Sequence, residues 1–140
     1  MRFLLDTMVL SEVRRREPHP AVVAWIDAVP EHDLAISVLT LGEIERGVAR
    51  LTDGGMRRRL ASWLDDELRP RFAGRILPVD DDVASIWGRT SGEAARAGRT
   101  IPVVDGLLVA TAQRHGLTFV TRNVAHVEGL GASLRNPWEP

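Results

Sequence analysis

The chain has 140 residues, of which 44% are hydrophobic and 26% charged, and these values are typical of one globular domain. The absence of cysteine excludes disulfides, thiolate metal ligands and a cysteine nucleophile. A net charge of −1 excludes a molecule that is basic as a whole, and no apolar stretch approaches the roughly 20 residues of a membrane span. We expect no signal peptide, because the first apolar run ends at Asp6, and we predict a cytosolic protein.

Short apolar segments alternate with segments of helical periodicity along the chain. In chain order, we predict a strand at 2–5, helices at 9–16 and 21–28, a strand at 34–37, helices at 39–51 and 56–68, a strand at 75–79, helices at 80–97 and 105–115, and strands at 118–121 and 132–135. Gly116 follows one helix in the position of a C-terminal cap. The alternation predicts a single α/β domain over residues 1–140, with a parallel sheet covered by helices on both faces.

All 18 basic residues are arginines, and many of them are clustered. The clusters lie at 14–16, at 57–59, and at Arg69, Arg71 and Arg75. Arginine binds phosphate through two parallel hydrogen bonds, so these clusters are candidates for holding a phosphate backbone. A GC-rich genome would explain the missing lysine, and exposed helix faces would explain the clustering.

Three acidic residues stand at positions where an α/β sheet binds ligands. Asp6 ends the first predicted strand, Glu43 lies in the helix after the second, and Asp105 opens the helix that leads into the fourth. Ligands of open α/β sheets bind outside the carboxyl ends of the strands, where the strand order reverses. If the first and fourth strands are neighbours, Asp6 and Asp105 meet there and Glu43 reaches in from its helix.

Three carboxylates brought together repel one another. A pair at about 4 Å costs roughly 4 kcal/mol at an effective dielectric constant near 20, so a proton, an arginine or a cation must compensate. Oxygen ligands suit Mg²⁺ or Mn²⁺, and these ions catalyse phosphodiester hydrolysis by activating water and neutralising phosphate charge.

Each acid also has a simpler interpretation. Asp6 and Asp105 could cap the helices that follow them, and Glu43 could be a solvated helix residue. The triplet at 80–82 is expected to act as a helix cap and to complement the helix dipole.

Four segments carry a recognisable pattern in order: FLLDTMVLSE at 3–12, SVLTLGEI at 37–44, DGLLVATA at 105–112, and TRN at 121–123 with the closing NPWE at 136–139. Together they resemble the PIN-domain family, and within it the VapC-type toxins and their FitB-like relatives. The resemblance covers essentially the whole chain.

The resemblance implies a three-layer α/β/α fold with a five-stranded parallel sheet in the order 3-2-1-4-5. It implies a Mg²⁺-dependent endoribonuclease, with Mn²⁺ as an alternative ion, that is the toxin of a type II toxin–antitoxin pair. Asp6, Glu43 and Asp105 carry over as catalytic and metal-binding acids, and Asn123 as an assisting catalytic residue. The implied partners are an RNA substrate, a cognate antitoxin protein and a second copy of the chain.

The chain departs from the family pattern at three places. The family usually has asparagine where this chain has Met8, many members have an acid where it has Asn123, and relatives often have aspartate where it has His126. Met8 and Asn123 favour an alternative, a catalytically weak or inactive PIN-fold module that binds RNA or another partner. A phosphatase or receiver-type protein is disfavoured, because those sites generally use a lysine and this chain has none.

Overall fold

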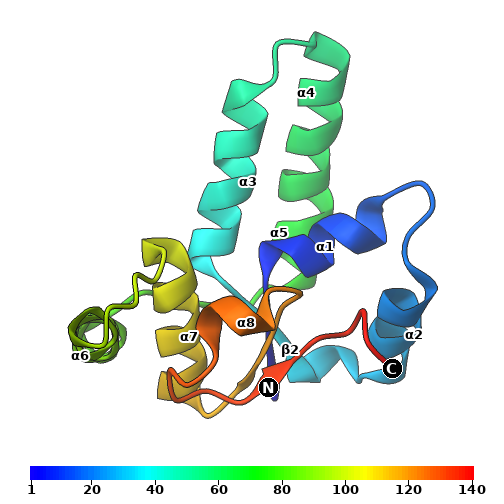
Figure 1. Ribbon diagram of the computed structural model, residues 1–140. Coiled ribbons are helices and arrows are strands. Elements are labelled where there is room, and N and C mark those ends of the chain that lie inside the picture. The colour runs from blue at the N-terminus through cyan, green and yellow to red at the C-terminus, as the bar shows by residue number, and fades with distance from the viewer.

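Five short parallel strands form the centre of the molecule, and helices cover both faces of the sheet (Figure 1). The computed structural model describes all residues, from Met1 to Pro140. The strands are β1 (Phe3–Leu5), β2 (Leu34–Ser37), β3 (Ile76–Leu77), β4 (Thr118–Val120) and β5 (Leu134–Arg135). Every neighbouring pair is parallel and the order is β3-β2-β1-β4-β5, which confirms the predicted fold class and strand order.

The main predicted helices are present, and most of their ends fall within two residues of the predicted bounds. The helical elements are α1 (Thr7–Arg14), α2 (Pro20–Ala28), the 3₁₀ turn η1 (Glu31–Asp33), α3 (Val38–Arg50), α4 (Gly54–Ser62), the π-helical segment η2 (Trp63–Leu68), α5 (Arg69–Arg71), α6 (Asp81–Arg96), α7 (Val103–His115) and α8 (Val124–Val127). The helix predicted at 56–68 is therefore continued as a π-helix in its second half. The predicted strands at 75–79 and 132–135 shorten to two residues each, because both lie at the sheet edges with a partner on one side only.

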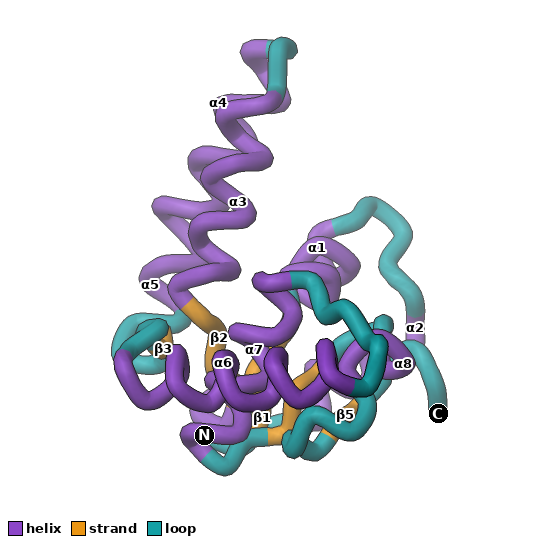
Figure 2. The backbone as a smooth tube through the Cα atoms, turned by 60° about the vertical axis from the view of Figure 1, so that its left-hand side comes forward, coloured by secondary structure: helices purple, strands orange, loops and turns teal.

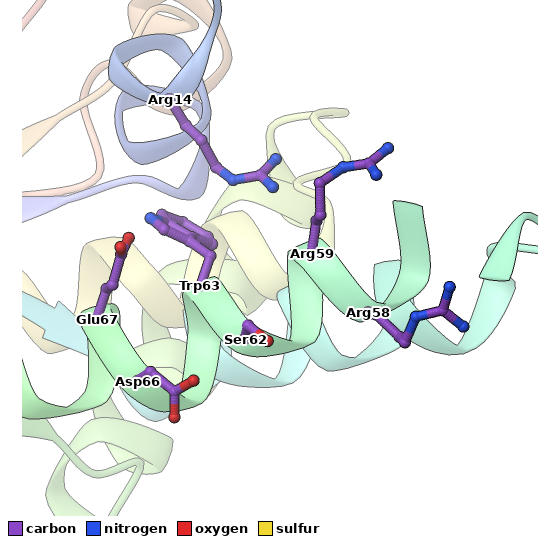
Figure 3. Close-up of a pocket in the computed structure, with 7 residues that line it drawn as sticks. All are labelled: Arg14, Arg58, Arg59, Ser62, Trp63, Asp66 and Glu67. Atoms are coloured by element: carbon purple, nitrogen blue, oxygen red, sulfur yellow. The ribbon is translucent and has the colours of Figure 1, made fainter. Parts of the chain in front are cut away.

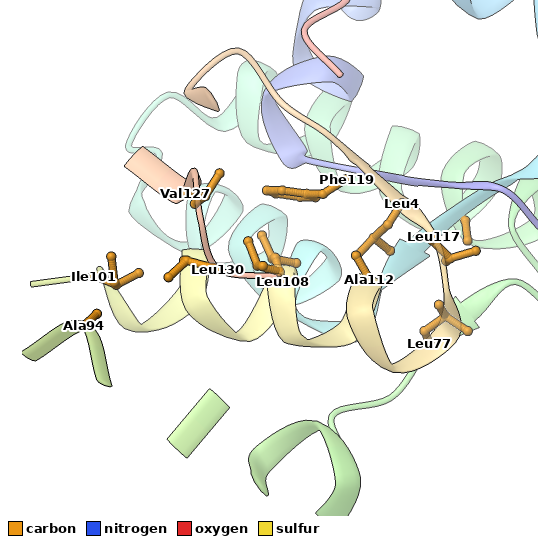
Figure 4. Close-up of a cluster of buried hydrophobic side chains, with 12 residues drawn as sticks. Leu4, Leu77, Ala94, Ile101, Leu108, Ala112, Leu117, Phe119, Val127 and Leu130 are labelled. Carbon is orange, nitrogen blue, oxygen red and sulfur yellow. The ribbon is translucent and has the colours of Figure 1, made fainter. Parts of the chain in front are cut away.

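Two hydrophobic cores lie on opposite faces of the sheet, because successive strand residues point to opposite sides. Leu4 and Phe119 pack into the core between the sheet and α7, shown in Figure 4. Their neighbours Leu5 and Val120 pack into the other core, beside α1 and η2. All four side chains are at most 1% exposed, and burying one such side chain contributes about 1.5–3 kcal/mol. The short strands are therefore held by burial on both faces.

Helices α3 and α4 run side by side as an arm that projects away from the sheet (Figures 1 and 2). The buried residues of α3 all lie in its first half, and α4 buries none. The arm begins directly after β2, so its base lies at the carboxyl edge of the sheet. No helix has both the length and the apolar character needed to cross a membrane.

Helices α6 and α7 pack tightly against each other at Gly106. A Cβ atom at this position would lie 2.9 Å from Cδ1 of Trp87, closer than real Cβ contacts. Gly88, in the middle of α6, has open space around its Cα. Substitutions at these two glycines therefore distinguish the effect of tight packing at Gly106 from the general effect of glycine on helix stability.

Replacing Gly106 by alanine should lower the free energy of unfolding by about 1–2 kcal/mol, because overpacking costs about 1–3 kcal/mol and the gain in helix propensity is at most about 1. The control Gly88→Ala should instead raise it by about 0.5–1 kcal/mol. Urea unfolding measures both. Equal stabilisation by the two substitutions would show that the Trp87 ring moves aside without cost.

Candidate active site

Parallel pairing of β1 with β4 places Asp6 beside Thr121. Leu5 is in register with Val120, so the next residue of each strand emerges at the same point of the carboxyl edge. The Asp6 amide donates to the Val120 carbonyl at 2.9 Å, and the Thr121 hydroxyl donates to Asp6 Oδ2 at 2.7 Å. The neighbouring position of these strands, on which the acid hypothesis depended, is confirmed.

Neither aspartate acts as the helix cap that the simpler interpretation proposed. Asp6 occupies the residue before α1, but its carboxylate makes no capping hydrogen bond and binds Thr121 instead. Asp105 does not open its helix as predicted, because α7 begins at Val103 after Pro102. A proline fits a helix start, where no backbone N–H is needed. Asp105 therefore lies within the first turn of α7, where the helix dipole favours a negative charge.

The three acids and Asn123 all line one cleft of about 430 Å³. They reach it from the residue between β1 and α1, from α3, from α7 and from the segment after β4, which come from distant parts of the chain. Glu43 is exposed, as its simpler interpretation required, but its carboxylate faces this cleft and accepts a hydrogen bond from the Thr7 hydroxyl at 2.8 Å. The structure therefore brings together every residue predicted for the site.

Asp6 is the buried member of the cluster, with 8% of its surface exposed. Burial raises the pKa of Asp6 above its ordinary value, and the charges of Glu43 and Asp105 raise it further, while the Thr121 hydrogen bond opposes the shift. The charged form of Asp6 is thus disfavoured in the folded protein unless a cation lies nearby.

The oxygen atoms of this cluster are the type of ligand that Mg²⁺ and Mn²⁺ prefer. No three acidic or histidine side chains converge closely enough to hold one ion together. Asp6 is held by its hydrogen bond from Thr121 and Glu43 by its hydrogen bond from Thr7, whereas the half-buried Asp105 side chain makes no hydrogen bond. The donor chemistry and the raised pKa of Asp6 therefore fit a divalent cation, which Glu43 and Asp105 would have to turn inward to bind.

Two of the three departing positions, Met8 and Asn123, contact each other. The Asn123 side-chain amide donates to Met8 Sδ at 3.4 Å, and its backbone N–H donates to the Thr121 hydroxyl at 3.2 Å. Thr121 thus joins Asn123 to Asp6. His126 is exposed and is not among the residues that line the cleft.

Sequence reasoning did not identify Glu12, Arg122 or Trp138 as parts of the cleft. Glu12 is 5% exposed and accepts hydrogen bonds from the His19 amide at 3.1 Å, from Arg15, and from Trp138 Nε1 at 3.4 Å. Burial opposes ionisation of this carboxyl, but the bonds from His19 and Arg15 hold the pKa of Glu12 below its usual value.

Two arginines line the cleft, and Arg122 is the one without an ion pair, because Arg15 pairs with Glu12. The Arg122 guanidinium lies 5.2 Å from the centre of the Trp138 ring and makes no ion pair. Glu12 thereby anchors the C-terminal Trp138, which in turn supports Arg122. The only signal in the sequence was that these residues fall inside the family-like segments 3–12, 121–123 and 136–139.

A parallel α/β/α sandwich with carboxylates at the carboxyl edge of its central strands defines the class of protein. The sequence model described as PIN domain matches residues 3–127, so the chain belongs to the PIN-domain family. It is 39% identical to Toxin FitB of Neisseria gonorrhoeae, over 96% of this chain and 97% of that one. It is 38% identical to VapC ribonuclease Y4jK of Sinorhizobium fredii, over 98% of each chain. The crystal structure of FitAcB from Neisseria gonorrhoeae superposes with a TM-score of 0.93 at 38% identity, over 99% of each chain.

Asp6→Asn should raise the melting temperature of the metal-free protein at pH 7. Folded Asp6 holds its proton to a higher pH than unfolded Asp6, whose ordinary pKa is 3.8. The contribution of Asp6 to stability is therefore most favourable below that value and is lost as the pH rises toward the raised folded pKa. Asparagine removes this loss and keeps an acceptor for Thr121. The difference between variant and wild type should shrink as the pH falls toward about 4.

Thermal melting in chelator across this pH range measures the effect. Asp27→Asn is the matched control, because Asp27 is exposed and unpaired, and it should change stability by less than about 0.5 kcal/mol. A lower melting temperature for Asp6→Asn at pH 7 would show that the carboxylate stabilises the fold.

Proposed function

We propose that this protein, with residues 1–140 forming one PIN domain, is a metal-dependent endoribonuclease that acts as the toxin of a toxin–antitoxin pair. The observation that carries the proposal is the gathering of Asp6, Glu43 and Asp105 around one cleft at the β1–β4 edge. The relatives named as a FitB toxin and a VapC ribonuclease support the same activity, since each is similar over nearly its whole length.

In this proposal Asp6 and Asp105 would hold Mg²⁺ or Mn²⁺, and Glu43 would hold the ion or position the attacking water. When bound, the ion supplies charge neutralisation at the phosphate and a more acidic water. Thr121 orients Asp6, and Thr7 holds Glu43 at the cleft. Arg122 binds a non-bridging phosphate oxygen, and Asn123 assists from the edge of the cleft.

A partner that blocks the cleft must compensate the negative charges of Asp6, Glu43 and Asp105. We propose that a cognate antitoxin inserts an arginine or lysine near Asp6 and Asp105, in competition with the metal. The similar solved structures include the toxin–antitoxin complex described as FitAB bound to an IR36 DNA fragment, with a TM-score of 0.92 at 37% identity. The homodimer that the resemblance implies stays a prediction, as does the cytosolic location.

Asp6→Asn, Glu43→Gln and Asp105→Asn should each lower RNA cleavage by about 100-fold or more, because losing about 3 kcal/mol of transition-state stabilisation has that effect. Water attack on phosphorus breaks the bond to the 3′ oxygen, so the products should carry 5′-phosphate and 3′-hydroxyl ends. End-group analysis and initial rates with and without Mg²⁺ measure both outcomes.

Glu45→Gln is the control for Glu43→Gln. Glu45 lies on the same helix and is also exposed, but it pairs with Arg69 outside the cleft. The RNA cleavage rate of Glu45→Gln should stay near that of the wild type, since an exposed ion pair contributes little to stability. Cyclic 2′,3′-phosphate products from pure protein would rule out the water mechanism.

The contact between Asn123 and Met8 favours the alternative of a weak or inactive PIN-fold module. In this contact the Asn123 amide donates its hydrogen bond to the Met8 thioether sulfur. If Asn123 borders the metal site, Asn123→Asp should tighten Mg²⁺ binding by about tenfold, since an added nearby carboxylate attracts the cation by at least 1.4 kcal/mol at an effective dielectric constant of about 20. Titration calorimetry measures the affinity. Unchanged or weaker binding would place Asn123 outside the metal shell.

A further inference from the structure

A row of three hollows that share lining residues, which we call the groove, leads from the acid cleft to the side of the molecule where α1 faces α4. The cleft shares Thr7, Ser11 and Glu43 with a neighbouring hollow of about 200 Å³. That hollow shares Arg14 and Trp63 with a third hollow of about 460 Å³. We call the third hollow the arginine pocket, and it is lined by Arg14, Arg58, Arg59, Trp63, Asp66 and Glu67, with Ser62 between them (Figure 3).

The arginines of this pocket are free for a ligand. The side chains of Arg14, Arg58 and Arg59 make no ion pair and no hydrogen bond within the protein. The Arg14 guanidinium instead lies 5.2 Å from the centre of the Trp63 ring. Figure 3 shows the carboxylates of Asp66 and Glu67 at one end of the pocket and Arg58 and Arg59 at the other. The positive charge is therefore concentrated at one end.

The cluster of Arg69, Arg71 and Arg75 is different, because its arginines bind carboxylates of the protein. Arg69 pairs with Asp65 at 3.2 Å and with Glu45 at 3.0 Å. Arg71 and Arg75 both pair with Glu31, at 2.7 and 3.3 Å. The charges of this third cluster are therefore compensated within the protein and connect η1, α3 and α5, which argues against the expectation that it holds a phosphate backbone.

We propose that the arginine pocket is a nucleotide subsite for the RNA strand whose scissile phosphate lies in the acid cleft, and this inference rests on the proposed function. Arg14, Arg58 and Arg59 bind a flanking phosphate, because guanidinium groups match phosphate geometry. A base of the same nucleotide stacks against the Arg14–Trp63 pair, since single-stranded RNA bases stack on guanidinium planes and aromatic rings. The groove keeps this nucleotide on the same strand as the reacting phosphate.

The test compares two double variants that each remove two exposed, unpaired arginines. Arg58→Gln with Arg59→Gln changes the pocket, and Arg89→Gln with Arg96→Gln changes α6, which does not line the groove. Binding of a fluorescein-labelled, mixed-sequence single-stranded oligoribonucleotide is measured by anisotropy in chelator, at several salt concentrations. Circular dichroism and sedimentation verify that each variant keeps its fold and its oligomeric state.

The pocket variant should bind the oligoribonucleotide about tenfold more weakly. Its slope of log affinity against log salt should fall by about 0.7, because the two arginines bind one phosphate and each phosphate contact on a single strand contributes about 0.7. The α6 variant should keep the wild-type affinity and slope. An equal loss of affinity in both variants would mean that RNA binding depends only on the net charge of the protein, and it would overturn the subsite.

Two further outcomes separate the subsite from the proposed function. If the pocket variant binds RNA normally but changes its sedimentation or loses binding to an antitoxin, the pocket is a protein interface and the subsite is overturned. If the wild type never cleaves RNA with Mg²⁺ while the pocket variant still loses affinity and slope, the nuclease proposal fails and the RNA subsite stands.

Discussion

The parallel pairing of β1 with β4 is the interaction on which the site depends. It aligns Leu5 with Val120, so that Asp6 and Thr121 leave the sheet together and form a hydrogen bond of 2.7 Å. Strands of three residues hold this register because alternate side chains are buried in two separate cores. A register slip of one residue would turn both sets of side chains to the wrong face, so burial fixes the position of the carboxylate.

The same burial makes the site electrostatically unfavourable without a cation. Asp6 is nearly enclosed, and Glu43 and Asp105 add like charges around the same cleft. Functional sites often keep such destabilising groups, since stability is given up where chemistry requires a poised charge. The negative charge of the cleft is balanced only in part by Arg122. Trp138 supports Arg122, and Glu12 holds Trp138 through a hydrogen bond.

Local patterns were sufficient for the strands, for most helices and for the positions of Asp6, Glu43 and Asp105, because alternation and strand ends are local signals. The strand order and the position of Asn123 in the site were predicted from the family resemblance. The start of α7 was misplaced by two residues, since Pro102 sets the helix start and this outweighs the capping preference of Asp105. Glu12 and Trp138 lie 126 residues apart in the sequence, and only the folded chain shows their contact. The arginine clusters looked alike in sequence, whereas the acidic partners of Arg71 and Arg75 are brought in from η1 by folding.

The central claim is that the buried Asp6 carboxylate belongs to a cation site. The most direct test is the melting temperature of wild type and Asp6→Asn at pH 7, each measured in chelator and then with increasing Mg²⁺. An ion that binds only the native state raises the stability by mass action, by about 2.7 kcal/mol at a concentration 100 times its Kd. A cation site at Asp6 predicts a Mg²⁺-dependent rise in melting temperature for the wild type and almost none for Asp6→Asn. An equal rise in both proteins, or none in the wild type, would contradict it.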